Sequence, residues 1–194
     1  MNANRRFLAA LLCVSTAAQA DTITERSVAR AQSVIDAAVA AHGGSERLSA
    51  LESLSIRHET GTHAVGQSRG TTPPWDVNEN NGSDAIHVDD AVFVTTNSGN
   101  GGGFQFDNAT VINGADSYQV DYRAGTATPI AEPDFATSSG PFVRVTPALL
   151  LRDAERRAHT AMYLGEEERG GRTYDVVAFS MEVGPAISLF VDRE

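Results

Sequence analysis

The acidic run Glu166, Glu167 and Glu168 is the densest group of potential catalytic side chains in the sequence, within YLGEEERGGRTYDVVAF. Neighbouring carboxylates can act as an acid and base pair or bind a cation. The glycines that follow, Gly170 and Gly171, are typical of a tight turn between two alternating strands. We therefore expect these acids to solvate a hairpin tip, with catalysis as the less favoured alternative.

The histidines His58 and His63, in HETGTH, raise the possibility of a zinc site. Two ligands on one helix face must be four residues apart, whereas these are five apart in a segment with a strand pattern. An odd spacing in a strand sends the side chains to opposite faces. The spacing predicts no metal site, and no other pattern indicates a cofactor.

A third candidate is HVDDAVF, where His87 and Asp89 would share a strand face and could form an acid and base pair. A half-exposed strand with polar residues outward explains the pattern equally simply, and we favour it. Elsewhere the glycine-rich stretch 97–106 joins two strands and opens no helix, as a phosphate loop would. The sequence contains no G-x-S-x-G elbow. We therefore assign no catalytic residue.

Aromatic side chains fall mostly on predicted strands and long loops. On one face of a curved sheet covered by a helix, they would line an apolar trough for an acyl chain or another apolar ligand. The alternative is an ordinary filled core. The predicted ligand-binding residues are Trp75, Phe93, Phe104, Phe106, Tyr118 and Tyr122.

The periodicity of the chain predicts the elements that position these side chains. Apolar residues recur at helical spacing from Ser27 to His42 and again over 145–159, and Ser45 is placed to cap a short helix. Alternating segments predict antiparallel strands, separated by irregular loops at 66–84 and 126–141. The predicted strand segments are 54–62, 84–96, 102–113, 116–125, 162–179 and 186–194. The predicted fold is α+β, a curved antiparallel half-barrel with helices on its concave face.

The N-terminal segment 1–20 has the order of a secretory signal peptide: Arg5 and Arg6, an apolar stretch and Ala18-Gln19-Ala20. The apolar stretch is too short to cross a membrane, and no later segment is longer. We expect an exported protein, periplasmic or secreted, whose residues 21–194 form one domain. Because Glu194 ends a strand without a turn, we also expect the natural product to continue.

The charge of the chain excludes some partners. Without segment 1–20, 13 arginines face 25 acids, a formal charge of −12, and there is no lysine. Such a surface disfavours nucleic acid and anionic membranes, which attract basic patches. The single cysteine, Cys13, lies in the expected signal, which leaves no disulfide or thiol nucleophile in the domain.

The order of motifs resembles the N-terminal domain of exported bacterial proteins whose later half is a metallo-β-lactamase-fold hydrolase. The motifs are VIDAAVAAHGGSERLSALESLSIRHETGTHAVGQS, TPALLLRDAERRA, YLGEEERGGRTYDVVAF and ISLFVDRE, which cover nearly all of the mature chain. The resemblance implies a C-terminal hydrolase domain as partner, with zinc ligands in an H-x-H-x-D-H run. This sequence has no such run, so the chain alone is expected to be inactive.

More distantly, G-x-x-Y-D-V-V followed by L-F-V-D-R is similar to the half-barrel of periplasmic lipoprotein carriers. That resemblance implies acyl chains held against the concave face of a bent sheet. Two functions of different class follow. The first is a non-catalytic module that binds an apolar or acyl ligand, and the second is an accessory domain of a zinc-dependent hydrolase.

Overall fold

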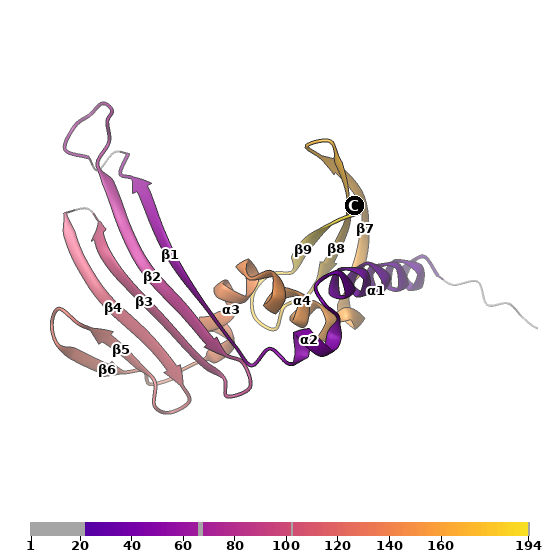
Figure 1. The fold of residues 1–194 in the computed structure, drawn as a ribbon, viewed down its shortest axis with the longest axis horizontal. Coiled ribbons are helices and arrows are strands. Elements are labelled where there is room, and N and C mark those ends of the chain that lie inside the picture. Colours follow the sequence, from indigo (N-terminus) through magenta and orange to yellow (C-terminus); the bar gives the residue numbers. More distant parts are fainter. Residues whose placement is uncertain (1–21, 66–67, 102, 194) are drawn as a thin grey trace, which may run out of the picture.

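The computed structural model describes residues 22–65, 68–101 and 103–193 (Figure 1). The expected signal peptide therefore lies outside the described residues. Two antiparallel sheets are separated by the second, third and fourth helices, whereas the first helix runs along the small sheet and extends past it (Figure 1). The α+β class is confirmed, but the strands are divided between two sheets where one curved sheet was predicted.

The first helix packs on the small sheet, and the second packs on the first helix and on the fourth. Helix α1 spans Ile23–Ala41 and starts earlier than its apolar pattern, because Thr22 and Glu25 form a reciprocal capping box. It ends at His42, where Gly43 takes a φ of 103° that few other residues would adopt. Helix α2 follows at Ser45–Ser49 and buries Leu48.

The large sheet has the strand order β1-β2-β3-β4-β5-β6, so each strand pairs with the next along the chain. Its longer strands are β1 (Ser53–His63), β2 (Val77–His87), β3 (Val92–Gly101) and β4 (Phe104–Asn113). The short strands β5 (Tyr118–Asp121) and β6 (Thr126–Pro129) complete it. None of its neighbours is parallel, in agreement with the predicted antiparallel pairing.

Two predicted boundaries in this sheet are wrong. The stretch 84–96, predicted as one strand, is the end of β2, a turn at 88–91 and the start of β3; Ala91 in that turn has a φ of 53°. The loop predicted at 66–84 contains most of β2. Its asparagines pair across the sheet instead of forming turns, as when Asn80 Nδ2 donates to Asn97 Oδ1 over 3.2 Å.

Helices α3 (Phe135–Val145) and α4 (Pro147–Arg156) join the sheets, followed by the 3-10 turn η1 (Ala158–Thr160). The predicted loop 126–141 is wrong at both ends, because it contains β6 and the start of α3. The Asp134 side chain accepts a hydrogen bond from the Thr137 backbone N–H and starts that helix. Helix α4 agrees with its predicted span, with Pro147 in its first turn.

The small sheet has the order β7-β8-β9, with strands at Met162–Arg169, Arg172–Phe179 and Ile187–Asp192. The predicted hairpin is confirmed, with Gly170 and Gly171 at positive φ in its turn. A bulge between Tyr163 and Gly165 shifts the register of β7 against β8.

The molecule has two hydrophobic cores. In the first, α1 packs on the inner face of the small sheet, with Ile35, Val177 and Phe179 at its centre. In the second, Phe142 of α3 packs on Phe93 of the large sheet, with ring centroids 5.9 Å apart. Helix α4 contributes to both, since Leu151 belongs to the first core and Leu149 to the second.

Candidate functional site

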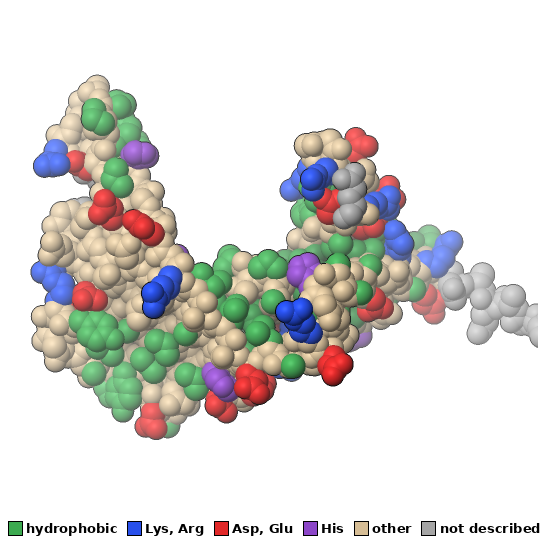
Figure 2. Space-filling view, viewed as in Figure 1, with side chains coloured by type: hydrophobic (Ala, Val, Ile, Leu, Met, Phe, Trp, Pro, Cys, Tyr) green, Lys and Arg blue, Asp and Glu red, His purple; other side chains and the backbone are tan. Residues whose placement is uncertain are grey.

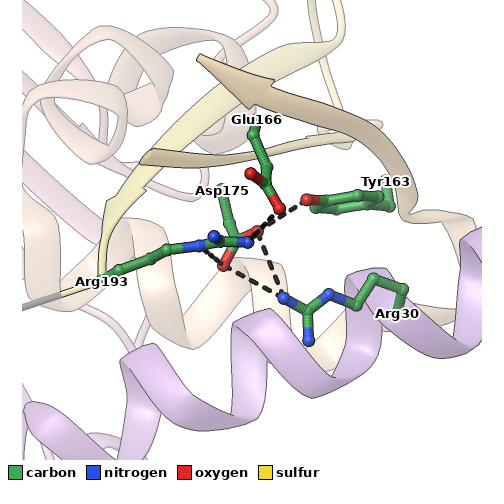
Figure 3. Close-up of polar contacts among 5 residues, drawn as sticks. All are labelled: Arg30, Tyr163, Glu166, Asp175 and Arg193. Atoms are coloured by element: carbon green, nitrogen blue, oxygen red, sulfur yellow. Dashed lines mark hydrogen bonds and ion pairs between the residues drawn. The ribbon is translucent and has the colours of Figure 1, made fainter. Parts of the chain in front are cut away.

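The most concentrated group of charged side chains surrounds Asp175 on β8 (Figure 3). Arg193 donates to both carboxylate oxygens, from Nε over 3.0 Å and from a terminal nitrogen over 2.8 Å. Tyr163 donates its hydroxyl to Oδ1 over 2.7 Å, and Arg30 of α1 reaches the same oxygen at 3.3 Å. Glu166 accepts a further bond from Arg193. Asp175 thus ties α1 and β7 to the segment after β9.

The electrostatics of this group favour a structural role. The hydrogen bonds from Arg193, followed by the bond from Tyr163, lower the pKa of Asp175 to about 2 although burial opposes that change. A carboxylate with that pKa is a poor general base near neutral pH. Burial and the bond to Asp175 raise the pKa of Tyr163. We conclude that the group is a structural clamp around the buried Asp175, and we call it the Asp175 clamp.

The neighbouring acids Glu166 and Glu167 have different partners in the structure. Glu166 joins the clamp through Arg193, whereas Glu167 pairs with Arg169 at the hairpin tip. Both glutamates are exposed, as the predicted hairpin tip requires. The participation of Glu166 in the clamp could not be seen from the sequence, because its partner lies 27 residues away.

The predicted aromatic residues lie in different surroundings. Phe93 is 5% exposed in the second core, while Phe104 is 79% exposed and Tyr122 56% exposed. The strand register puts Phe93, Phe104 and Phe106 on one face of the large sheet and Tyr118 on the other. Trp75 is half-buried in the segment before β2. The structure does not gather the six into one trough, and ligand binding by them stays a prediction.

Two of the histidine candidates, His58 and His87, each lie close to one carboxylate. His58 Nδ1 lies 3.8 Å from an Asp84 oxygen on the neighbouring strand, and His63 lies on the opposite face of β1. His87 Nδ1 lies 3.3 Å from Asp90 across the turn, instead of facing Asp89. Asp89 pairs with Arg152 of α4. Among the described residues, no group of three or more acidic, histidine or cysteine side chains is placed to hold a metal ion.

A cavity of about 420 Å³ lies where the large sheet meets α3 and α4, and we call it the α3–α4 cavity. On the face shown in Figure 2, the surface is hollowed between the two sheets, and hydrophobic side chains lie over the helices at the base of the hollow. The cavity wall is formed by Ile86, Val88, Pro133, Asp134, Phe135, Ala136, Ser139, Gly140, Val143, Leu149, Arg152, Asp153, Arg156, Met181, Glu182 and Val183.

Most polar groups in that wall already have partners. Arg152 donates to the Leu51 carbonyl over 2.6 Å, and Arg157 donates to Asp153 Oδ1 over 3.0 Å and to Glu182 over 2.9 Å. There are two exceptions: Asp153 Oδ2, which is buried and has no hydrogen-bond partner among the described residues, and the exposed Arg156, which no described carboxylate pairs with. The cavity therefore offers a mainly apolar wall with one acceptor and one cation, a set that suits a mainly apolar molecule with a polar group.

The cavity was not predicted from the sequence, because much of α3 falls in a segment that has the pattern of a loop. One local signal was available: Asp134 follows Pro133 and precedes Thr137, the spacing of a side-chain helix cap. The contributions of Ile86 and Met181 come from distant segments and had no comparable signal.

Comparison with known proteins finds no relative of this chain: no family model, curated protein or solved structure matches it. No helix among the described residues has the length and apolar character needed to span a membrane. The candidate function therefore depends on the geometry of the chain itself.

Proposed function

We propose that this chain is an exported, non-catalytic domain that binds an apolar or acyl ligand in the α3–α4 cavity. The observation that carries the proposal is the cavity itself, about 420 Å³ in volume, within the range of small-molecule sites. Export is supported by the signal-like segment 1–20.

The composition of the wall supports an apolar ligand. Side chains such as Ile86, Phe135 and Met181 surround the space, and most charged groups at its edge are held by other protein groups. An acyl chain entering the cavity would remove apolar surface from water on both partners. Asp153 Oδ2 would accept a hydrogen bond from a hydroxyl or amide group of the ligand.

The strands form two sheets and not the single half-barrel of the carriers, and the feature that the layout shares with them is a helix packed on an antiparallel sheet. Here α3 packs against β3 and β4, and α4 continues from it toward the small sheet (Figure 1). In this proposal the cavity beside α3 and α4 takes the place of the aromatic trough.

We expect Ala136→Trp to weaken binding of the neutral apolar fluorophore N-phenylnaphthylamine at least fivefold, because Ala136 lines the cavity and an indole there would fill it. Titration of the purified protein followed by fluorescence measures this. Ala37→Trp, at an exposed position of α1 outside the cavity, is the matched control and should bind the probe normally.

Circular dichroism of both variants will show whether they fold, and Ala136→Leu provides a smaller obstruction if the tryptophan variant does not. Lipid extraction of protein from the periplasm, followed by mass spectrometry, tests for a natural ligand. Unchanged probe affinity in folded Ala136→Trp, or no probe binding by the wild type, would refute the proposal. The accessory role beside a zinc hydrolase would then be favoured.

A further inference from the structure

A second hollow, of about 410 Å³, lies beside β9 and the end of α1, and we call it the β9 groove. Its wall is mainly apolar, with Val145, Leu150, Leu189 and Phe190 among its residues. Val145 is 76% exposed and Phe190 36% exposed, so apolar surface faces water here. The groove shares no lining residue with the α3–α4 cavity.

Arg144 is the unusual member of this wall. Its terminal nitrogen donates to the Val183 carbonyl over 2.9 Å, but its Nε is buried and has no hydrogen-bond partner among the described residues. No described carboxylate forms an ion pair with it, in contrast to the arginines of the Asp175 clamp. A half-buried guanidinium that has no carboxylate partner can pair with an anion brought by a ligand.

The segment before β9 fixes the position of the Arg144 guanidinium. A Cβ atom at Gly184 would meet the Arg144 terminal nitrogen, so glycine at that position leaves the space that the guanidinium occupies. Gly184 has a φ of 98°, which also favours glycine. Arg144 is thus held between α3 and the segment before β9.

The other ionisable residues of the groove are compatible with a bound anion. His42 Nδ1 lies 2.9 Å from the Ala38 carbonyl, which makes Nδ1 the donor of that hydrogen bond. His42 lines the groove, and its Nε2 forms no hydrogen bond among the described residues. Asp192, the acid in the wall, is engaged with Arg172 over 2.8 Å.

We propose that the β9 groove is a second binding site, which takes a single-chain anionic amphiphile such as a fatty acid. The apolar chain lies along Leu150, Leu189 and Phe190, and the carboxylate accepts hydrogen bonds from Arg144. This site does not depend on the α3–α4 cavity, since the two hollows have separate walls and Arg144 lines only the groove.

The test compares dodecanoate with dodecanol, which have the same chain length and differ in charge, by calorimetric titration of the purified protein. We expect the wild type to bind dodecanoate at least tenfold more tightly. Dodecyl phosphate, in a third titration, distinguishes a carboxylate site from a more general anion site.

Arg144→Met should abolish the preference for dodecanoate, and Arg144→Lys should retain part of it because the charge remains. Arg26→Met, at the far end of α1, is the control for the loss of one positive charge and should keep the full preference. Ala41→Trp, which narrows the groove without changing Arg144, should weaken binding of both ligands, while Ala37→Trp should not.

Equal binding of dodecanoate and dodecanol by the wild type would overturn this inference, as would an undiminished preference in folded Arg144→Met. Ala136→Trp separates the two sites, because it should reduce binding of the neutral fluorophore and leave dodecanoate binding unchanged. Loss of dodecanoate binding in that variant would assign the anion to the α3–α4 cavity instead.

Discussion

Phe93→Ala is expected to lower the free energy of unfolding by about 3 to 5 kcal/mol, the usual range for a buried phenylalanine. Phe93 is 5% exposed and packs against Phe142, so its removal leaves a void between the large sheet and α3. The loss combines transfer of the ring to water with the contacts its neighbours no longer make. Chemical denaturation with urea, followed by circular dichroism, measures the change.

Phe104→Ala is the matched comparison on the same sheet face. Because Phe104 is 79% exposed, we expect a change of less than about 0.5 kcal/mol. If Phe104→Ala were as destabilising as Phe93→Ala, the assignment of the second core would be wrong. Phe104→Ala should therefore report on ligand binding at this position without a stability defect.

Asp175→Asn should cost about 2 to 3 kcal/mol of unfolding free energy, which is less than loss of a partner in a fully buried ion pair. The change leaves Arg30 and Arg193 without their shared carboxylate, although Arg193 keeps its ion pair with Glu166. Both arginine side chains are partly exposed, at 46% and 36%, which limits the penalty. Urea denaturation at pH 7 measures it.

The same clamp predicts a pH dependence of stability. The pKa of Asp175 is about 2 in the folded protein against 3.8 ordinarily, so the folded state holds the ionised form more strongly. This contribution, about 2 kcal/mol, is fully present above pH 4 and is lost as the pH falls from about 4 to 2. Asp175→Asn should remove this part of the acid sensitivity.

The control for the clamp is Glu167→Gln, which removes an exposed partner of Arg169 at the hairpin tip. We expect almost no change in stability from it, because exposed pairs contribute little. A slope between pH 4 and 2 that is the same in wild type and Asp175→Asn would contradict the role given to Asp175.

The elements that the sequence predicted well have local signals. The apolar spacing of α1 and α4 and the Gly170-Gly171 turn depend on residues a few positions apart. Strand β2 and helix α3 were missed because their residues favour turns locally. Asparagine and glycine in β2 are held by pairing with both neighbouring strands, and in α3 tertiary packing outweighs Gly140 and Pro141.

The candidate sites were harder to predict because each depends on contacts between distant segments. Asp175 meets Arg30 across 145 residues, and nothing near either position indicates the pairing. The α3–α4 cavity likewise combines β2, two helices and the segment before β9. The aromatic residues were grouped because of their residue type, but the structure buries Phe93 and leaves Phe104 and Tyr122 exposed.

Helix α4 mechanically links the two halves of the molecule. Leu149 and Leu151 are two residues apart, so they point to opposite sides of the helix and anchor it in different cores. A tilt of either sheet relative to α4 would therefore disturb the packing of this helix in the other core. Movement of one sheet relative to the other is thereby restrained, and we expect a molecule bound against one side of α4 to reduce motion on the other side as well.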